Sequence, residues 1–350
     1  MFHTIWLRAR TSAAGACGAT APGLPPFRFV ASDMDGTVLS PHHILSEYTT
    51  ETLRRLTQEL HVPFIFATGR VYADVAIINQ EMQRFFQARR RQIPLTSATA
   101  CTGTPTYIIT SNGAVIHNAE TGELVHEHAL DPDIVRELYH LLPVSETRIN
   151  TGIIQGDHWF YRMDWEEMLR FHKQSGYRYQ VLERIPDSAQ LSGIQTRSTQ
   201  PASSSAVGGS LQHVHKIFFS SWDRPRLEKL EAMLQNRYGE ELTVTFSSSY
   251  NIDITGKGVT KASALETLYS VMTPLPHETA STATPGQRLK ATVAFGDDLN
   301  DGAMLQRAGL GFIMGNCNPQ LLQRCPNLEV IQTNAEDGVA RKLVEVFNLE

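Results

Sequence analysis

Two aspartates stand two positions apart at the end of a short apolar segment. Asp33 and Asp35 follow residues 27–31, and Gly36 and Thr37 come directly after them. Neighbouring carboxylates raise each other's pKa unless a cation neutralises them, so the pair indicates a metal site. Ligands that are all oxygen atoms favour Mg²⁺, which keeps several waters and leaves room for a phosphate group. The alternative is a solvated turn, because Asp-Gly is a common turn dipeptide.

A second acidic group follows the apolar residues 291–295. Asp297, Asp298 and Asp301 fill three of five positions there, and this density of negative charge is costly without a cation. Asn300, in the same loop, can donate a hydrogen bond to a phosphate oxygen. The alternative is an N-capping loop for the next helix, and one aspartate can fill that role while another binds metal.

A hydroxyl and a cation complete this set of polar groups. Thr68 ends the apolar segment 62–67 and offers its hydroxyl and nearby backbone N–H groups to an anion. Lys261 opens a predicted helix, where a positive charge opposes the helix dipole, so an anionic partner would explain it. A plain Thr-Gly turn and a solvated lysine are the alternatives for these two residues.

The elements that must position these residues alternate between strand and helix from residue 27 to residue 110. This alternation predicts an α/β fold with a Rossmann-like parallel sheet. In such sheets ligands bind at the carboxyl ends of the strands, where polar residues follow each apolar segment. The predicted strands are 27–31, 62–67 and 107–110, and the predicted helices are 49–60 and 71–86.

The pattern changes from about residue 114. A helix that begins at Asp131, a hairpin within 149–162 and a further strand, helix and strand up to residue 247 predict a separate α+β layer. Strands and helices alternate again after residue 290. We therefore expect a core of residues 27–114 and 249–350, with an inserted α+β layer of residues 115–248.

Three polar stretches are predicted to be surface insertions. They are rich in Ser, Thr, Ala, Pro or Gly and too polar to build a core. These stretches are 89–103, 188–209 and 272–288.

Composition and charge exclude several classes of protein. The 350 residues are 41% apolar and 19% charged, with a net charge of −5, which argues for a globular core and against a dedicated nucleic-acid binder. No apolar run approaches the roughly 18 to 20 residues that span a membrane. The four cysteines are scattered, with no C-x-x-C motif and no histidines nearby to pair with them, so we expect neither a disulfide framework nor a structural zinc site, and a reducing compartment fits.

Residues 1–26 are predicted to be a leader outside the folded part. They contain arginines and no acidic residue, which is compatible with a mitochondrial or other organelle transit peptide. Prolines interrupt any long amphipathic helix there, so a disordered leader and a cytoplasmic protein are the preferred interpretation.

The motifs together resemble the haloacid dehalogenase superfamily, and within it the Cof-type sugar phosphatases. The order is D-x-D-G-T at Asp33, a threonine at the end of a strand, a lysine, and G-D-x-x-N-D from Gly296 to Asp301. Ser111-Asn112-Gly113 and Gly258-Val259-Thr260-Lys261 add to the match. The resemblance covers roughly residues 28–350.

This resemblance implies roles for the acidic residues. Asp33 would be the nucleophile that takes the phosphoryl group and would also bind Mg²⁺. Asp35 would be the general acid and base, with its backbone carbonyl on the metal. Asp297 would be the remaining metal ligand of the protein. Asp301 would hold the metal ligands in position without binding the metal itself.

The resemblance also implies where the substrate lies. Thr68, Lys261 and Asn300 would hold the phosphoryl oxygens, and the inserted layer of residues 115–248 would be a cap that closes over the site. Candidates for contact with the rest of the substrate are Asn112 at the third strand end and, in the cap hairpin and beyond it, Asp157, His158, Trp159 and Arg162. For the cap residues, packing or exposure to solvent is the alternative.

The expected function is a phosphatase that acts on a small phosphorylated metabolite, with a sugar phosphate as the leading substrate class. A phosphomutase that moves phosphate within a sugar is the second reading. A catalytically silent binding protein on the same scaffold is the third, and it is disfavoured because every motif residue is present. No nucleic-acid or membrane partner is expected.

Overall fold

The structure is a computed structural model that describes residues 27–92, 106–165, 178–185, 211–275, 278–279 and 281–349. The expected leader of residues 1–26, the expected insertion 188–209 and most of the expected insertion 89–103 lie outside the described residues. No helix within the described ranges has both the length and the apolar composition needed to cross a membrane.

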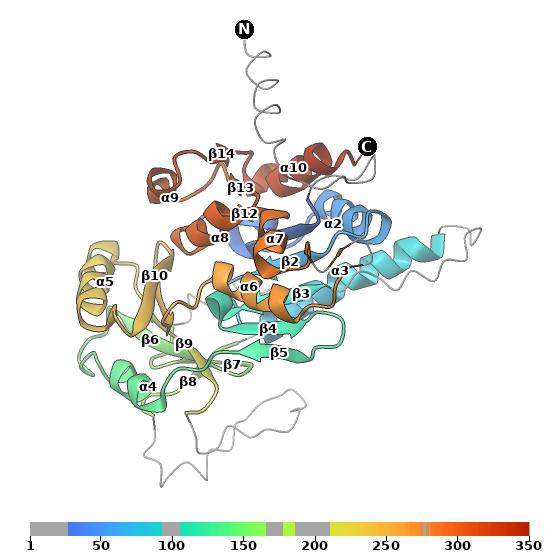
Figure 1. The fold of residues 1–350 in the computed structure, drawn as a ribbon. Coiled ribbons are helices and arrows are strands. Elements are labelled where there is room, and N and C mark those ends of the chain that lie inside the picture. The colour runs from blue at the N-terminus through green and yellow to red at the C-terminus, as the bar shows by residue number, and fades with distance from the viewer. Residues whose placement is uncertain are drawn as a thin grey trace.

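An eight-stranded sheet forms the larger part of the fold (Figure 1). Its strands run in the order β14-β13-β12-β1-β2-β3-β4-β5. Neighbours from β14 to β3 are parallel, which confirms the predicted α/β fold, while β4 and β5 add an antiparallel edge. The strands are β1 (Phe29–Ser32), β2 (Phe64–Ala67), β3 (Tyr107–Thr110), β4 (Val115–Asn118), β5 (Leu124–Glu127), β12 (Thr292–Gly296), β13 (Leu310–Ile313) and β14 (Glu329–Val330).

Helices cover both faces of this larger sheet. Successive side chains of a strand point to opposite faces, so Phe64 and Phe66 of β2 pack in one apolar cluster and Ile65 and Ala67 in the other. The first cluster contains residues of α2 (Glu47–Arg54), η2 (Arg55–Glu59), α3 (Tyr72–Gln92) and α10 (Gly338–Phe347). The second contains residues of α6 (Lys261–Val271), α7 (Pro285–Lys290), α8 (Gly302–Arg307) and α9 (Pro319–Arg324).

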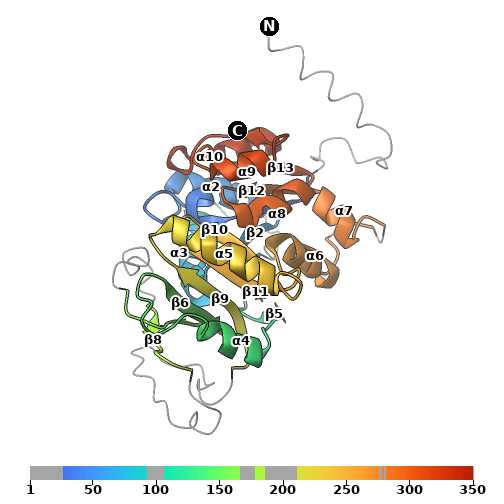
Figure 2. The same ribbon diagram turned by 90° about the vertical axis from the view of Figure 1, so that its left-hand side faces the viewer.

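A six-stranded sheet forms the second part of the fold, with α4 (Pro132–Tyr139) and α5 (Arg224–Tyr238) packed on it (Figure 2). Asp131 caps α4 by accepting hydrogen bonds from two backbone N–H groups, as predicted. The strand order is β10-β11-β9-β6-β7-β8. The strands are β6 (Asn150–Gln155), β7 (His158–Tyr161), β8 (Gln180–Val181), β9 (Val214–Ser220), β10 (Leu242–Ser248) and β11 (Asn251–Gly256).

The two faces of the smaller sheet have different tasks. Ile217 and Phe219 of β9 pack in the same cluster as the apolar residues of α4 and α5. Lys216 and Phe218 alternate with them and line a cavity that also reaches the carboxyl ends of β1 and β2. One face of the smaller sheet therefore packs against α4 and α5, and the other face lies toward the larger sheet.

The sheets divide the chain at places that differ from the predicted boundaries. β4 and β5, residues 115–127, pair with the larger sheet, and β11, residues 251–256, pairs with the smaller one. The expected boundaries at 115 and 248 therefore need correction as sheet boundaries. Antiparallel edge strands show the same alternation of side chains as cap strands, so sequence patterns do not separate them. The division into a core and a cap domain stays a prediction.

The stretch 272–288 is more than a polar surface insertion. Arg288 is fully buried, with its guanidinium 2.7 Å from a carboxylate oxygen of Glu278 and 2.7 Å from the carbonyl oxygen of Tyr269. Leu275 is buried as well. A buried charge is tolerated when a partner and hydrogen-bond acceptors surround it, and this network anchors the stretch to α6. The prediction of a stretch too polar to enter a core was wrong here.

Candidate active site

Asp33 lies at the carboxyl end of β1, in the middle of the larger sheet. Its backbone N–H donates to the carbonyl of Phe295 at 3.0 Å, which ties it to β12. Its carboxylate Oδ1 accepts a hydrogen bond from Lys261 Nζ at 2.6 Å. The residue is only 7% exposed and yet lines the cavity. Asp33 is thus a fixed carboxylate at the floor of that cavity.

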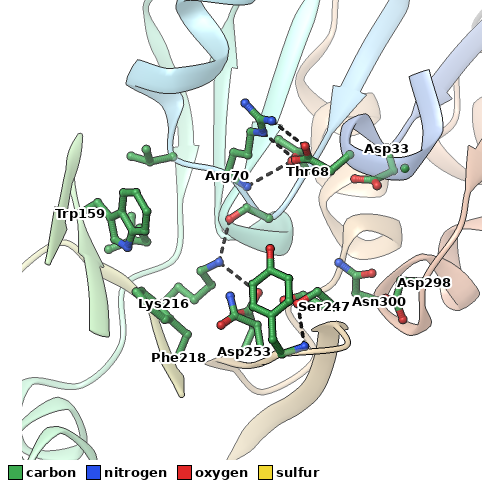
Figure 3. Close-up of a pocket in the computed structure, with 18 of the residues that line it drawn as sticks. Asp33, Thr68, Arg70, Trp159, Lys216, Phe218, Ser247, Asp253, Asp298 and Asn300 are labelled. Atoms are coloured by element: carbon green, nitrogen blue, oxygen red, sulfur yellow. Dashed lines mark hydrogen bonds and ion pairs between the residues drawn. The ribbon is translucent and has the colours of Figure 1, made fainter. Parts of the chain in front are cut away.

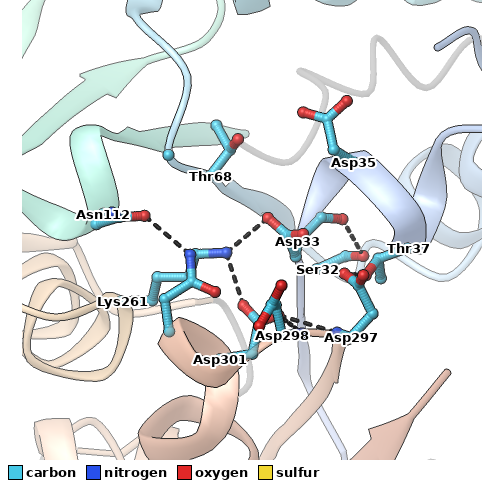
Figure 4. A network of polar contacts seen from close by, with 12 residues as sticks. Ser32, Asp33, Asp35, Thr37, Thr68, Asn112, Lys261, Asp297, Asp298 and Asp301 are labelled. Carbon is cyan, nitrogen blue, oxygen red and sulfur yellow. Dashed lines mark hydrogen bonds and ion pairs between the residues drawn. The ribbon is translucent and has the colours of Figure 1, made fainter. Parts of the chain in front are cut away.

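Lys261, the first residue of α6, is completely buried between two carboxylates (Figure 4). Its Nζ donates to Asp33 and, at 2.6 Å, to Asp301 Oδ1. Burial alone would lower the pKa of Lys261, but the charges of Asp301 and Asp33 raise it above its ordinary value. The lysine is therefore a permanent cation next to the carboxylate of Asp33.

Asp301 organises the second acidic loop. Its Oδ2 accepts hydrogen bonds from the backbone N–H groups of Asp297 and Asp298, at 2.9 and 3.0 Å. Its Oδ1 accepts from Lys261. Because both oxygens have protein partners and the side chain is fully buried, Asp301 holds the loop and the lysine in place and is poorly available for direct binding of a ligand.

Three carboxylates converge opposite this single lysine. One oxygen each of Asp33, Asp297 and Asp301 lie within 4.8 Å of one another. Asp297 Oδ1 accepts a hydrogen bond from Thr37 Oγ1 at 2.8 Å. Burial and the charge of Asp33 raise the pKa of Asp297 well above its usual range, and burial raises the pKa of Asp33 to about 7 although Lys261 opposes this. A divalent cation with a preference for oxygen would relieve this repulsion, so the donor set fits a metal.

Gly36 lets the two acidic segments approach each other. Its φ is +73°, in the left-handed region, and a Cβ atom built on it would lie 2.3 Å from Asp297 Oδ2. Any side chain would displace the Asp297 carboxylate from its position opposite Asp33. The glycine of the first motif is thus required by the aspartate of the second.

We expect Gly36→Ala to lower the turnover rate by about 10²-fold, because small displacements of a reacting group have effects of this size. The matched control is Gly258→Ala, since Gly258 has a φ of +74° and no heavy atom within 4 Å of the added Cβ. Each variant is expected to lose about 1–2 kcal/mol of stability from the left-handed backbone. Kinetics and urea unfolding of both variants separate the two effects, and equal activity in the two variants would contradict the proposed contact.

Asp35 is held away from Asp33 by residues that sequence reasoning missed. Arg70 donates to both of its oxygens, from Nε at 2.6 Å and from Nη2 at 2.5 Å, and His43 Nδ1 lies 2.8 Å from Oδ1. Partial burial would raise the pKa of Asp35, but Arg70 and then His43 hold it well below its usual range. Asp35 is therefore ionised in this state. Arg70 follows the strand end at Thr68 by two positions, which was a usable signal, whereas nothing in the sequence pointed to His43.

The other predicted phosphate ligands also lie at this edge of the sheet. The buried hydroxyl of Thr68 accepts a hydrogen bond from the backbone N–H of Arg70 at 3.2 Å and lines the cavity. Asn300 also lines the cavity and donates from Nδ2 to Asn112 Oδ1 at 3.0 Å. Asn112 donates in turn to Asp253 Oδ2 at 2.6 Å. Asn112 therefore connects the phosphate side of the site to β11 of the smaller sheet.

A cavity of about 280 Å³ lies between the two sheets (Figure 3). Its roof is one face of the smaller sheet, and it presents aromatic rings and one buried ion pair. Lys216 Nζ lies 3.0 Å from Asp253 Oδ2 and donates at 2.7 Å to the carbonyl of Gly69 in the larger part. The roof residues are Ile154, Trp159, Tyr161, Lys216, Phe218, Tyr250 and Asp253.

Three predicted substrate residues are not among those that line this cavity. Asp157 is exposed in the turn between β6 and β7, and His158 has the strand position opposite to that of Trp159. Arg162 is buried and donates to the carbonyl of Leu142 at 2.8 Å. We therefore correct the expectation for Asp157, His158 and Arg162, because alternation along β7 turns Trp159 toward the cavity and its neighbours elsewhere.

Comparisons with known proteins agree with this geometry. A sequence profile of the haloacid dehalogenase-like hydrolase family matches residues 30–343. A Haemophilus influenzae protein named as a phosphatase is 31% identical over 325 residues, 93% of this chain and 98% of its own. An HMP-PP phosphatase of Shigella flexneri is 32% identical over 306 residues, 87% of this chain and 90% of its own.

Solved structures show the same fold. A haloacid dehalogenase-like hydrolase from B. subtilis has a TM-score of 0.65 at 22% identity, covering 90% of this chain and 98% of its own. A sugar phosphatase of HAD subclass IIB has a TM-score of 0.61 at 17% identity, covering 92% and 100%. At these identities the likeness concerns the fold.

Proposed function

The chain belongs to the haloacid dehalogenase-like hydrolases and is a phosphatase, and from this premise we propose that it hydrolyses phosphate monoesters of small metabolites with Mg²⁺ through a phosphorylated Asp33. The observation that carries the proposal is the carboxylate of Asp33, which lies at the cavity floor, is 2.6 Å from a fully buried lysine, and has Asp297 opposite it. Sugar phosphates are the leading substrate class.

The residues that would hold Mg²⁺ are Asp33, Asp297 and the backbone carbonyl of Asp35. Oxygen donors alone, two of them carboxylates with raised pKa values, match the preference of this ion. When bound, it supplies positive charge that offsets the repulsion between an anionic nucleophile and an anionic substrate. Nucleophilic attack and proton transfer are carried out by the protein's own side chains.

Two displacements then complete the reaction. A carboxylate oxygen of Asp33 attacks phosphorus, the bond to the leaving oxygen breaks, and that oxygen takes a proton from Asp35. Water next attacks the phosphorus on Asp33 and gives a proton to Asp35, which releases phosphate and restores both residues. Lys261, Thr68 and Asn300 hold the phosphoryl oxygens, since phosphoryl transfer depends mainly on positioning and charge neutralisation.

The ion pair of Asp35 with Arg70 adds a step to this scheme. Asp35 must carry a proton to act as an acid, and Arg70 opposes this in the substrate-free state. An incoming phosphate dianion competes for the same guanidinium, which also lines the cavity. Once Arg70 turns toward the substrate, the carboxyl group of Asp35 loses the contact that lowers its pKa and can receive a proton.

The acid role of Asp35 predicts a dependence on the leaving group. Asp35→Asn is expected to lower turnover of an alkyl phosphate by about 10²- to 10⁴-fold, the usual contribution of a general acid. An aryl phosphate such as p-nitrophenyl phosphate leaves without a proton, so its loss in the first step should be much smaller. Single-turnover rates with both substrates measure this difference, and equal losses would remove the acid role.

A substrate screen with full-length protein tests the proposed function. Mg²⁺-dependent release of inorganic phosphate from sugar phosphates, and its loss on chelation, is the expected result. Hexose 1-phosphate separates the alternatives, since free phosphate indicates hydrolysis and an isomerised sugar phosphate indicates a mutase. The HMP-PP named for a relative belongs in the same screen. No turnover of any compound in the screen, HMP-PP included, would favour a silent binding protein.

A further inference from the structure

A second cluster of ligating side chains lies outside the active site. Glu127, His213 and His215 point their polar atoms at one another, and one donor atom of each lies within 4.8 Å of the others. His213 Nδ1 is 2.9 and 3.0 Å from the two carboxylate oxygens of Glu127. His215 Nε2 is 3.0 Å from Glu127 Oε2. None of the three lines the active-site cavity.

The cluster joins the two sheets. Glu127 is the last residue of β5, the edge strand of the larger sheet, whereas His215 belongs to β9 of the smaller sheet. Between them the backbone N–H of Leu130 donates to the carbonyl of Val214 at 2.7 Å. This places the cluster where the chain passes from one sheet to the other.

The backbone at His213 favours the convergence of the two histidines. Its φ is +61°, a left-handed conformation that is uncommon for a residue with a side chain. In an extended strand the side chains of residues two apart point to the same face and run parallel to each other. At His213 the backbone is left-handed instead, and the imidazoles of His213 and His215 converge on one carboxylate. Such conformations persist where the surrounding structure holds them.

The types of side chain identify the class of ion. Two imidazoles and one carboxylate are a ligand set for Zn²⁺ and similar transition-metal dications, whereas Mg²⁺ prefers oxygen alone. Three protein ligands leave the fourth tetrahedral position to water. The site is partly buried and open to solvent on one side, because the side chains are 4% exposed for His215, 29% for Glu127 and 60% for His213.

The charge within the cluster suits a cation. Both imidazoles lie on the single carboxylate of Glu127, and an anionic ligand of this kind attracts a dication.

We propose that Glu127, His213 and His215 form a binding site for a Zn²⁺-type dication that links β5 to the start of β9. The site is separate from the carboxylates around Asp33 and does not depend on the proposed phosphatase mechanism. Binding there crosslinks the two sheets at one edge.

Calorimetric titration of the metal-free full-length chain with Zn²⁺, in excess Mg²⁺, tests this proposal. Mg²⁺ occupies oxygen-only sites, so the difference between variants reports the mixed site. Wild-type protein is expected to bind one more Zn²⁺ than His213→Asn or Glu127→Gln, and Zn²⁺ should raise the melting temperature of the wild type but not of these variants. Glu127→Gln keeps the size of the side chain and removes its charge.

The matched control is His61→Asn. His61 is exposed like His213 and has a similar φ of +55°, and asparagine tolerates this backbone region. It should bind as much Zn²⁺ as the wild type. Co²⁺, added as a spectroscopic probe, should give intense visible bands of low coordination number in the wild type and the control only. Equal Zn²⁺ binding in all four proteins, or no binding in the wild type, overturns the proposal.

Discussion

Replacing Asp33 by asparagine is expected to lower turnover by about 10⁴-fold or more while the fold stays intact, because the loss of a nucleophile removes the covalent route. The substitution keeps the shape of the side chain and its contact with β12 through the backbone. Lys261 retains its second partner, Asp301, so no buried cation is left alone. Steady-state kinetics and circular dichroism measure the two parts of this prediction.

The matched control for this variant is Asp298→Asn. Asp298 lines the same cavity but uses its carboxylate to accept from Leu299 N–H and Asn318, contacts that an asparagine oxygen can keep. We expect less than about a tenfold loss, since no reacting group is removed. A single turnover is started with a substrate that carries a labelled phosphoryl group and is then quenched with acid. This should trap a base-labile phosphoprotein in the control and not in Asp33→Asn. Unchanged activity in Asp33→Asn would exclude the nucleophile role.

The same variant reports on the charge of the site without metal. The raised pKa of Asp33, about 7 against an ordinary 3.8, means that the folded state holds this proton more tightly than the unfolded state. The contribution of Asp33 to stability is therefore present at low pH and lost as pH rises from about 4 to 7. Asp33→Asn should remove this decline from the free energy of unfolding, measured by urea denaturation in chelator.

Lys261→Met is expected to have the second large effect, on stability as well as on activity. Methionine fills a similar volume, but Asp33 and Asp301 would then face each other without their cation in a fully buried place. Breaking a buried ion pair by removing one partner costs about 3–5 kcal/mol. Turnover should fall by about 10³-fold, the effect of removing a preorganised charge from the transferring group.

Two further variants sharpen this experiment. Lys229→Met removes an exposed lysine from α5 and should change the free energy of unfolding by less than about 0.5 kcal/mol. Adding Asp301→Asn to Lys261→Met removes one of the stranded charges, so it should recover stability without recovering activity. If Lys261→Met were as stable as the wild type, this would contradict the buried contacts of Lys261 with Asp33 and Asp301.

The parallel part of the fold was predictable from sequence because its signals are local. Apolar segments such as 62–67 are short, and each is followed by a helical pattern and a polar strand end. The same logic brought Asp33 and Asp297 to one edge, since carboxyl ends of parallel strands meet there. Partners that depend on side-chain direction were beyond this reasoning. His43 reaches Asp35 from a loop with no periodic pattern.

The face of the smaller sheet that lines the cavity was predictable only in part. Choosing Asp157, His158 and Arg162 rested on their nearness to a hairpin, which fixes position along a strand but not the face. A better signal was a charge next to apolar residues within a strand. Lys216 precedes Ile217 in β9, and Asp253 lies between Ile252 and Ile254 in β11. Buried charges of this kind need partners, and the two residues are each other's partner.

The ion pair between Asp33 and Lys261 joins residues 228 positions apart. During synthesis on the ribosome, β1 and Asp33 emerge before the whole smaller sheet, and α6 supplies the cation only after that sheet. Asp297 and Asp301 come later still. A nascent chain that has not reached Lys261 therefore carries Asp33 without its cation, and one that has not reached Asp301 lacks part of the proposed centre.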